Sequence, residues 1–347
     1  MQTLPFAIRV AAAAATLTIA SLPAAHAADV NIYSSRQPAL LQPLLDAFKT
    51  ETGLTATAVF IEKGMEERIK AEGANSPADL VMTIDIGRLD AAKQAGILQP
   101  VKSDVLEKNI PATFRDPAGE WFGLTSRGRV AYVSAERVKD TALTYEGLAD
   151  PKWKGKLCIR SAQHQYNVAL VAAFIAHHGE ADTRKWLEGF RDNLATKPEG
   201  GDRDQAKAIA AGECDIGLGN TYYVGLMQTN EKEPAQKEWA KAIRVVMPTF
   251  ENGGTHVNIS GVGLAKNSPN KANAVKLMEW LSSDEAQRIY ADANYEYPVE
   301  PGIAVSETVK AFGTLKPDTI SLSDIAKNRP AAAKLINEVE FDAGPRS

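Results

Sequence analysis

Three tyrosines stand where their hydroxyl groups could share one ligand. Tyr222 and Tyr223 are adjacent in "GNTYYVG", between a predicted strand and a helix that Asn220 or Thr221 would cap. Side chains of a first helical turn lean toward the helix N-terminus, and neighbours are about 100° apart, so both phenols can point at one space. Tyr166, in "AQHQYNVAL", stands just ahead of another predicted helix that begins near residue 167.

Three phenols in one place suit a hard, highly charged cation. A phenolate is an anionic oxygen ligand, whereas soft or borderline metals favour Cys and His. A bound metal can deprotonate a phenol well below its ordinary pKa of about 10, and three phenolates would neutralise Fe(III). Adjacent tyrosines also stack on sugars or other flat solutes, or simply pack, so their spacing alone leaves these interpretations open.

A second group of residues favours an anion. Arg36 and Gln37 lie in a loop before a helix that we expect to begin near residue 40, because Pro43 is tolerated only in a first helical turn. A guanidinium, an amide and a helix N-terminus together favour a small anion. Such an anion could complete the coordination of a metal held by the tyrosines.

The usual catalytic signatures do not occur in the sequence. It has no Walker glycine loop, HExxH, GxSxG or CxxC motif. His177 and His178 are expected to form a solvated pair at a helix end, and His164 and His256 stand alone in loops. An exported enzyme that uses Tyr and Arg, such as a lyase, therefore has little support from the sequence.

The N-terminus predicts export. Arg9, the apolar run "VAAAAATLTIASLPAA" and "AHA" at residues 25–27 are typical of a cleaved signal peptide, residues 1–27. The apolar run is too short to favour a membrane span, and no Cys follows it for a lipid anchor. In an exported chain Cys158 and Cys214 are expected to form a disulfide between neighbouring strands. The net charge of −4 argues against nucleic acid and anionic membranes as partners.

The remaining chain is too long for one core, so we expect two lobes. Strand–helix alternation begins at "DVNIYSS" and begins again at "DPKWKGKLCIRS". Two long extended runs, "WFGLTSRGRVAYVS" and "GTHVNISGVGLAKN", could cross between the lobes. The pattern predicts an α/β fold of mixed, mainly parallel sheets with a cleft between two lobes.

Several motifs resemble the periplasmic ferric-ion-binding proteins of ABC iron importers. They include "NIYSSRQPAL", "WFGLTSRGRV", "YNVAL", "GGDRDQ", "GNTYYVG" and "NYEYPV", and they run from residue 31 to about residue 299. The resemblance implies a type II periplasmic-binding-protein fold with two hinge strands. It also implies a monomeric, non-enzymatic protein of the periplasm that captures Fe(III) and delivers it to a membrane permease.

The same resemblance implies a division of the chain. Lobe 1 would comprise residues 28–127 and 254–302, and lobe 2 residues 128–253. A helical segment, residues 303–347, would follow and could return to lobe 2. A protein of the same fold that binds an organic or oxyanionic solute is the alternative.

The resemblance also implies a ligand set. The iron ligands would be Tyr166, Tyr222 and Tyr223. One branch of the family has "RHY" after the first strand and gains a His or Tyr ligand there. This sequence has "RQP" at residues 36–38, so it resembles the branch in which three tyrosines and a carbonate-like anion bind the metal.

Carbonate or bicarbonate would then lie against the first lobe. Arg36 and Gln37 are the expected contacts of this anion. Arg127 or Arg129, in the first extended run, could also reach the anion or a phenolate, although structural pairing is an equal expectation for either.

Overall fold

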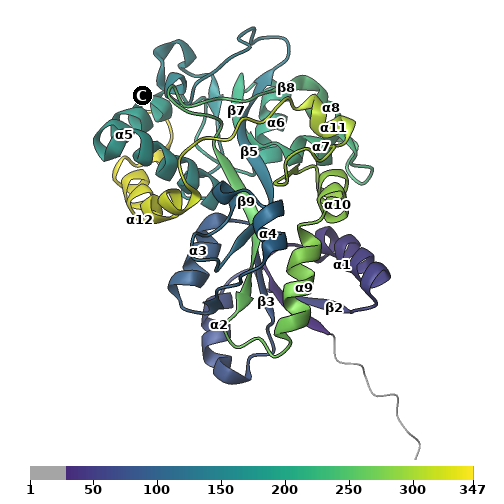
Figure 1. Cartoon of the computed structure of the whole chain (residues 1–347). Coiled ribbons are helices and arrows are strands. Elements are labelled where there is room, and N and C mark those ends of the chain that lie inside the picture. Colours follow the sequence, from purple (N-terminus) through teal and green to yellow (C-terminus); the bar gives the residue numbers. More distant parts are fainter. Residues whose placement is uncertain (1–28, 347) are drawn as a thin grey trace, which may run out of the picture.

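The computed structural model describes residues 29–346, which form two lobes (Figure 1). The predicted signal peptide lies outside the described residues. Within residues 29–346, no helix has the length and the apolar character that a membrane crossing requires.

The lower lobe in Figure 1 is built on a five-stranded path with the order β2–β1–β3–β9–β5. Its strands are β1 (Val30–Ser34), β2 (Ala56–Phe60), β3 (Leu80–Thr83), β4 (Leu98–Gln99), β9 (Val257–Ala265) and β10 (Tyr297–Pro298), with the first half of β5 (Phe122–Ser134). Its helices are α1 (Pro38–Thr52), α2 (Met65–Glu72), α3 (Ile86–Gln94), α4 (Asp104–Asn109), α9 (Lys271–Leu281) and α10 (Asp284–Asn294).

The upper lobe continues from the second half of β5. Its strands are β6 (Leu157–Cys158), β7 (Ile216–Asn220) and β8 (Ile243–Val246). Its helices are α5 (Gln165–Asp192), α6 (Asp202–Ala211), α7 (Tyr222–Gln228), α8 (Ala235–Ala242), α11 (Glu307–Ala311) and α12 (Leu322–Glu338). The C-terminal helix α12 packs on α5 (Figure 1).

Strand β5 connects the lobes. Residues 122–128 pair with β9, and from Arg129 onward the strand pairs with β7 and β8 instead. All of its residues are buried, as expected for a strand that passes through both cores. Pairing is parallel within β2–β1–β3 and between β6 and β7, and antiparallel where β5 and β9 meet their neighbours. The predicted mixed α/β fold of two lobes is confirmed, but the sheets are not mainly parallel, because β5 and β9 run antiparallel to all the strands with which they pair.

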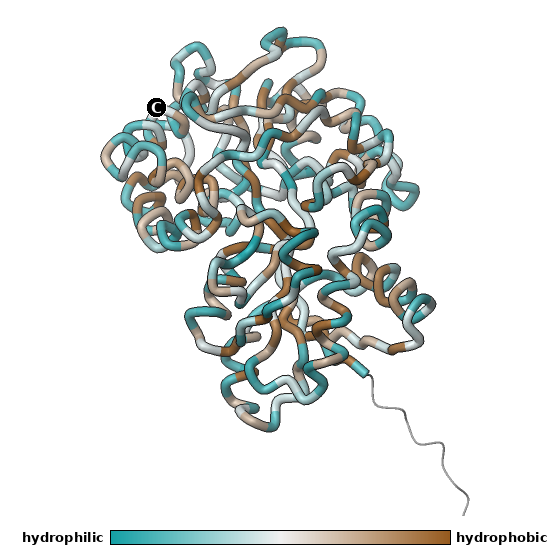
Figure 2. Tube along the Cα trace, viewed as in Figure 1, coloured by the Kyte–Doolittle hydropathy of each residue, from teal (hydrophilic) through white to brown (hydrophobic). Residues whose placement is uncertain are grey.

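Hydrophobic residues concentrate on the central strands and on the inner faces of the helices (Figure 2). In α1, the buried positions are Leu41, Leu44, Leu45 and Phe48, the helical spacing read from the sequence. Burial of this stripe fixes which face of α1 meets the sheet, and so sets where the loop before α1 enters the cleft.

Helix α1 begins earlier than predicted. It starts at Pro38, with Gln37 as N-cap, and Pro43 lies inside it. Proline suits the first helical position because its φ is already helical and its missing N–H has no partner to lose. Pro43 removes a bond to the carbonyl of Ala39, but both residues are exposed, so water can solvate that carbonyl.

Cys158 and Cys214 form a disulfide. Cys158 ends β6, and Cys214 lies two residues before β7, the parallel neighbour of β6. The bond therefore joins the end of β6 to the segment just before β7 in the upper lobe.

His177 and His178 are not a solvated pair. They lie at a kink in α5 where Gly179 leaves the helical conformation with φ 75°. His177 pairs with Asp318 and His178 with Glu146, each at 2.7 Å. Both carboxylates come from segments distant in sequence, so local pattern could not reveal them.

Candidate functional site

A cleft of about 490 Å³ separates the two lobes at the predicted site. The first lobe contributes the loop before α1 and the end of β2, and the second contributes the first turns of α5, α6 and α7. All three tyrosines, Arg36, Gln37 and Arg127 line it. The lining also holds four acidic residues, Glu62, Asp202, Asp204 and Glu296, and five arginines, Arg36, Arg88, Arg127, Arg160 and Arg203.

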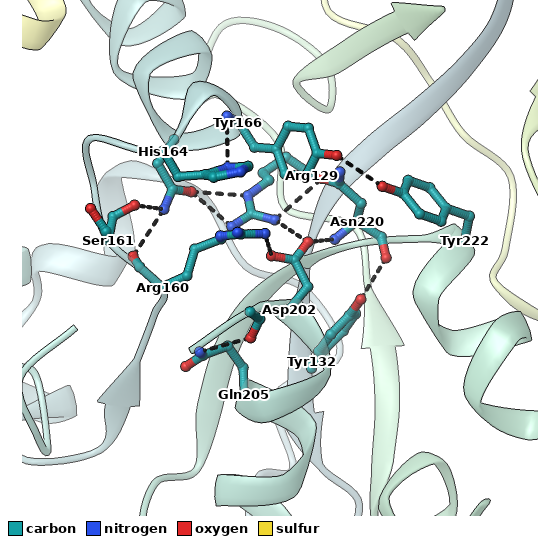
Figure 3. A network of polar contacts seen from close by, with 12 residues as sticks. Arg129, Tyr132, Arg160, Ser161, His164, Tyr166, Asp202, Gln205, Asn220 and Tyr222 are labelled. Atoms are coloured by element: carbon teal, nitrogen blue, oxygen red, sulfur yellow. Dashed lines mark hydrogen bonds and ion pairs between the residues drawn. The ribbon is translucent and has the colours of Figure 1, made fainter. Parts of the chain in front are cut away.

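The tyrosines converge as the sequence predicted. Thr221 is the N-cap of α7, so Tyr222 and Tyr223 are its first two residues, and their rings lie 4.3 Å apart. Tyr166 is the second residue of α5, because that helix begins at Gln165, two residues earlier than expected, and His164 is its N-cap. The hydroxyls of Tyr166 and Tyr222 are 3.1 Å apart (Figure 3). Oxygens at this separation can bind one ion.

The site favours the neutral form of Tyr222 and Tyr223. Burial raises the pKa of Tyr222 well above its ordinary value, and the neighbouring Tyr166 and Tyr223 raise it further. Burial also raises the pKa of Tyr223, with Tyr166 and Asp202 adding to the effect. A cation that binds here as a phenolate complex must therefore displace protons, and its binding must weaken in acid.

Arg36 already has a carboxylate partner. Its guanidinium is buried and lies 2.8 Å from Glu296 Oε2, and it also donates to the hydroxyl of Ser260. Gln37 is exposed at the cleft, at the N-terminus of α1. The charge of Arg36 is thus balanced by Glu296, a residue that pattern reading did not single out.

Arg127 and Arg129 face different surroundings although they are two residues apart on β5. Arg127 lines the cleft and donates to Ser260 Oγ at 2.9 Å and to the carbonyl of Ile84. Arg129 points into lobe 2, where its Nη1 is 2.7 Å from Asp202 Oδ2. Of these two arginines, Arg127 is therefore the one placed to meet a ligand.

Two further arginines lie beside the tyrosines. Arg160 is 5.5 Å from the ring centre of Tyr166, and Arg203 is 5.4 Å from that of Tyr223. Cations at such distances are attracted to the ring face. Both residues stand in motifs that carry the family resemblance, "KLCIRS" and "GGDRDQ", but neither motif has a spacing that marks it as a site.

The rest of the described chain offers no comparable metal site. Residues 29–346 contain no group of three or more His, Cys, Asp or Glu side chains that could hold a metal. The phenols are therefore the candidate donor set, and they favour a hard cation.

Comparisons with known proteins show the family of this chain. The family described as "Bacterial extracellular solute-binding protein" matches residues 75–317. "Iron uptake protein A1" of Synechocystis is 45% identical over 312 residues, which cover 89% of this chain and 86% of the relative.

Two solved structures show the same fold. The ferric iron-binding protein A of Mannheimia haemolytica, in an open conformation, is 52% identical with a TM-score of 0.86, covering 91% of this chain and 99% of that one. The Trichodesmium protein named IdiA or FutA, in complex with iron and citrate, is 44% identical with a TM-score of 0.86, covering 90% and 99%. The resemblance read from the sequence motifs is confirmed, and the chain belongs to the bacterial extracellular solute-binding protein family.

Proposed function

We propose that this protein is the periplasmic solute-binding component of an ABC transporter and that it captures Fe(III) between its lobes. The observation that carries the proposal is the distance of 3.1 Å between the hydroxyls of Tyr166 and Tyr222. Tyr223 follows Tyr222 at the start of α7. The names of the similar proteins, an iron uptake protein and a ferric iron-binding protein, support the choice of metal.

The three tyrosines would bind the metal as phenolates. Tyr166, Tyr222 and Tyr223 would each lose a proton, and their three negative charges would balance Fe(III). Hard oxygen donors select a trivalent ion over softer metals that prefer sulfur or nitrogen. The ion would dock on lobe 2 first, since all three donors belong to that lobe.

An anion, carbonate or bicarbonate, would complete the coordination from the other side. Arg36, Gln37 and Arg127 would contact it, since all three line the cleft. Arg127 would be the strongest of these contacts, because its guanidinium lies 4.0 Å from the carboxylate of Glu296, whereas Arg36 is paired with Glu296 at 2.8 Å. A bidentate oxyanion matches the planar guanidinium.

Closure of the lobes about a hinge would trap the complex. Strand β5 changes partners between residues 128 and 129, one residue beyond the expected boundary, and this supports lobe 1 at residues 28–127 and 254–302 and lobe 2 at residues 128–253. The segment 303–347 would belong with lobe 2, because α12 packs on α5. The closed monomer would then deliver iron to an inner-membrane permease, without catalysis and without nucleic acid.

Ferric loading tests the proposal. Iron-loaded protein is expected to show a visible phenolate-to-iron charge-transfer band, and Tyr222→Phe or Tyr223→Phe is expected to weaken the retention of Fe(III) severely. Tyr33→Phe is the matched control, because that phenol donates to Glu72 in the other lobe. A colourless wild-type protein after loading would refute ferric binding.

Removal of bicarbonate tests the anion separately. Affinity for Fe(III) is expected to fall in bicarbonate-free buffer and to return when bicarbonate is added. An unchanged affinity in the absence of citrate and phosphate would remove the anion from the proposal while leaving the metal in place.

The arginine-rich lining favours one second candidate, an organic or oxyanionic solute. Arg127, Arg160 and Arg203 border a cleft that is larger than a single metal ion requires, and a similar protein is described in complex with iron and citrate. Calorimetry with Fe(III), citrate and ferric citrate separates the two. Heat from citrate alone would favour the organic solute, and heat only when iron is present would favour the metal.

A further inference from the structure

We propose that Asp202 is a positioning residue that holds the two segments bearing the three tyrosines in one arrangement. The inference rests on the proposed function, because it assigns a role in iron binding to a residue that does not itself bind the metal. It is carried by the buried network behind Tyr166 that Figure 3 shows.

Asp202 joins three segments with its two carboxylate oxygens. Its side chain is fully buried. Oδ2 accepts from Arg129 Nη1 at 2.7 Å and from the backbone N–H of Asn220 at 2.9 Å, and Oδ1 accepts from Arg160 Nη1 at 3.2 Å. One group at the first position of α6 thus ties together β5, the segment after β6 and the end of β7.

Three chains of contacts start at Asp202, and each is called a limb of the network. The first limb leads to Tyr166. Arg129 donates from Nε and Nη2 to Asn167 Oδ1 at 3.1 and 2.8 Å. Asn167 in turn donates from Nδ2 to the carbonyls of Arg160 and Ser161. Asn167 follows Tyr166 in the first turn of α5, so this chain of bonds sets where that turn lies and where the phenol emerges.

The second limb leads to Tyr222 and Tyr223. Asn220 is held at its N–H by Asp202, at its Oδ1 by Arg129 at 3.2 Å, and at its carbonyl by the hydroxyl of Tyr132. It lies two residues before Tyr222, with only the N-cap between them. The end of β7 is thereby fixed immediately before the chain turns into α7.

The third limb acts on a ring. Arg160 bonds to Asp202 and lies over the ring of Tyr166 at 5.5 Å, and Arg129 lies 5.9 Å from the same ring. The two guanidiniums therefore border the phenol that approaches Tyr222. Loss of the carboxylate would leave two cations beside each other in a buried site, and both would move.

Stability alone is a weak explanation for this network. A buried ion pair contributes little compared with well-packed apolar groups of the same volume, because removing two charges from water is costly. What the network supplies is direction, since each bond is made only in one geometry. Fixed donor positions are what a metal site needs, and loss of outer partners of metal ligands lowers metal affinity by about 10- to 100-fold.

Asp202→Asn tests the role with little change in shape. The amide oxygen can still accept from Arg129 and Asn220, but the amide nitrogen then faces the guanidinium of Arg160, donor against donor. We expect Fe(III) to dissociate to a competing chelator about 10- to 100-fold faster than from wild type. We also expect the charge-transfer band of the iron-loaded, folded fraction to shift.

Asp215→Asn is the matched control. Asp215 pairs with Arg137 in the same lobe, but at the opposite end of β7 and partly exposed to solvent. Its band and its iron dissociation rate are expected to equal those of wild type. A merely structural loss lowers the melting temperature of the metal-free protein without moving the band, so both are measured for every variant.

Arg160→Met covers the case in which Asp202→Asn does not fold. It removes only the limb nearest solvent, since the Arg160 side chain is 17% exposed, and it is expected to shift the band and speed iron loss in the same direction. Suppose that wild type shows the charge-transfer band, and that the folded Asp202→Asn and Arg160→Met variants have the same band position and the same iron dissociation rate as wild type. That result would overturn the positioning role of Asp202 and leave the proposed function in place. Absence of the band in wild type would instead overturn the proposed function.

Discussion

Arg329 of α12 reaches Asp85 at the N-terminus of α3, with Nη2 3.4 Å from Oδ1, so the C-terminal helix of one lobe is tied to the other lobe. Arg329 Nη1 also donates to the carbonyl of Gln165, the residue before Tyr166. Asp85 is buried, caps α3 by accepting from the N–H of Gly87, and accepts from Asn258. This contact therefore joins the helix that carries Tyr166 to the far wall of the cleft.

Gly87 makes the contact possible. A Cβ added there would collide with the guanidinium of Arg329. We expect Gly87→Ala to displace Arg329 and lower the free energy of unfolding by about 1 kcal/mol, the order of one intramolecular hydrogen bond. We expect Arg329→Ala alone to cost a similar amount.

A double-mutant cycle isolates this contact. In the Arg329→Ala background the collision is gone, so Gly87→Ala should be neutral or slightly stabilising, because Ala favours helix more than Gly. Chemical denaturation of the four proteins measures the coupling. If the changes in the free energy of unfolding were strictly additive, the absence of Cβ at Gly87 would not be what allows the Arg329 contact.

The disulfide closes a loop of 56 residues. In the chain-entropy model, a loop of this length contributes about 4 kcal/mol by restricting the unfolded chain. Replacement of Cys158 and Cys214 together by Ser is expected to lower the melting temperature by several degrees, because the restriction on the unfolded chain is lost. The two serine hydroxyls would also replace sulfur in a buried cluster that includes Tyr132 and Ile209. An unchanged melting temperature in the double variant would show that the bond contributes little.

The convergence of the tyrosines could be predicted because its information is local. Adjacent Tyr222 and Tyr223 follow a strand and begin a helix, and helical geometry alone brings their side chains to one side. The alternation of strands and helices was enough to predict two α/β lobes. The long extended run that forms β5 was enough to predict a crossing between them.

The partners of that site could not be predicted because they depend on distant contacts. Glu296 is 260 residues from Arg36, and Asp202 is 73 residues from Arg129. No periodicity or spacing relates such pairs, and each is set only when the strands have paired. The helix start at Pro38 was missed for a different reason, since an exposed proline can remain inside a helix when water solvates the carbonyl it leaves unbonded.

Stability in acid should depend on His256. This ring is 1% exposed, neither of its nitrogens has a hydrogen-bond partner, and burial lowers its pKa to about 3. Between pH 6.5 and pH 3 the unfolded chain binds a proton that the folded protein does not, so stability falls as pH falls. The slope is about 1.4 kcal/mol per pH unit from this group.

His256→Phe should reduce that acid slope by the same amount, because the replacement cannot take up a proton and no hydrogen bond is lost. Urea unfolding at several pH values between 3.5 and 6 measures it. The variant and wild type should converge above pH 7. If the free energy of unfolding varied with pH in parallel for the two proteins, another group would control the loss of stability in acid.

Iron binding should release protons and weaken in acid. The pKa values of Tyr222 and Tyr223 are raised, chiefly by burial, so both phenols carry their protons at neutral pH in the metal-free protein. Each phenolate that binds Fe(III) expels one proton, and the apparent affinity should rise about tenfold per pH unit for each proton released. Proton release on ferric loading, followed in a pH-stat near pH 7, measures the number of protons released per iron bound.

Tyr223→Phe should release about one proton fewer per iron bound. It is loaded from the same ferric stock as the wild type, so that protons from iron hydrolysis cancel in the comparison. Equal release by the two proteins at equal iron binding would show that Tyr223 is not a phenolate ligand.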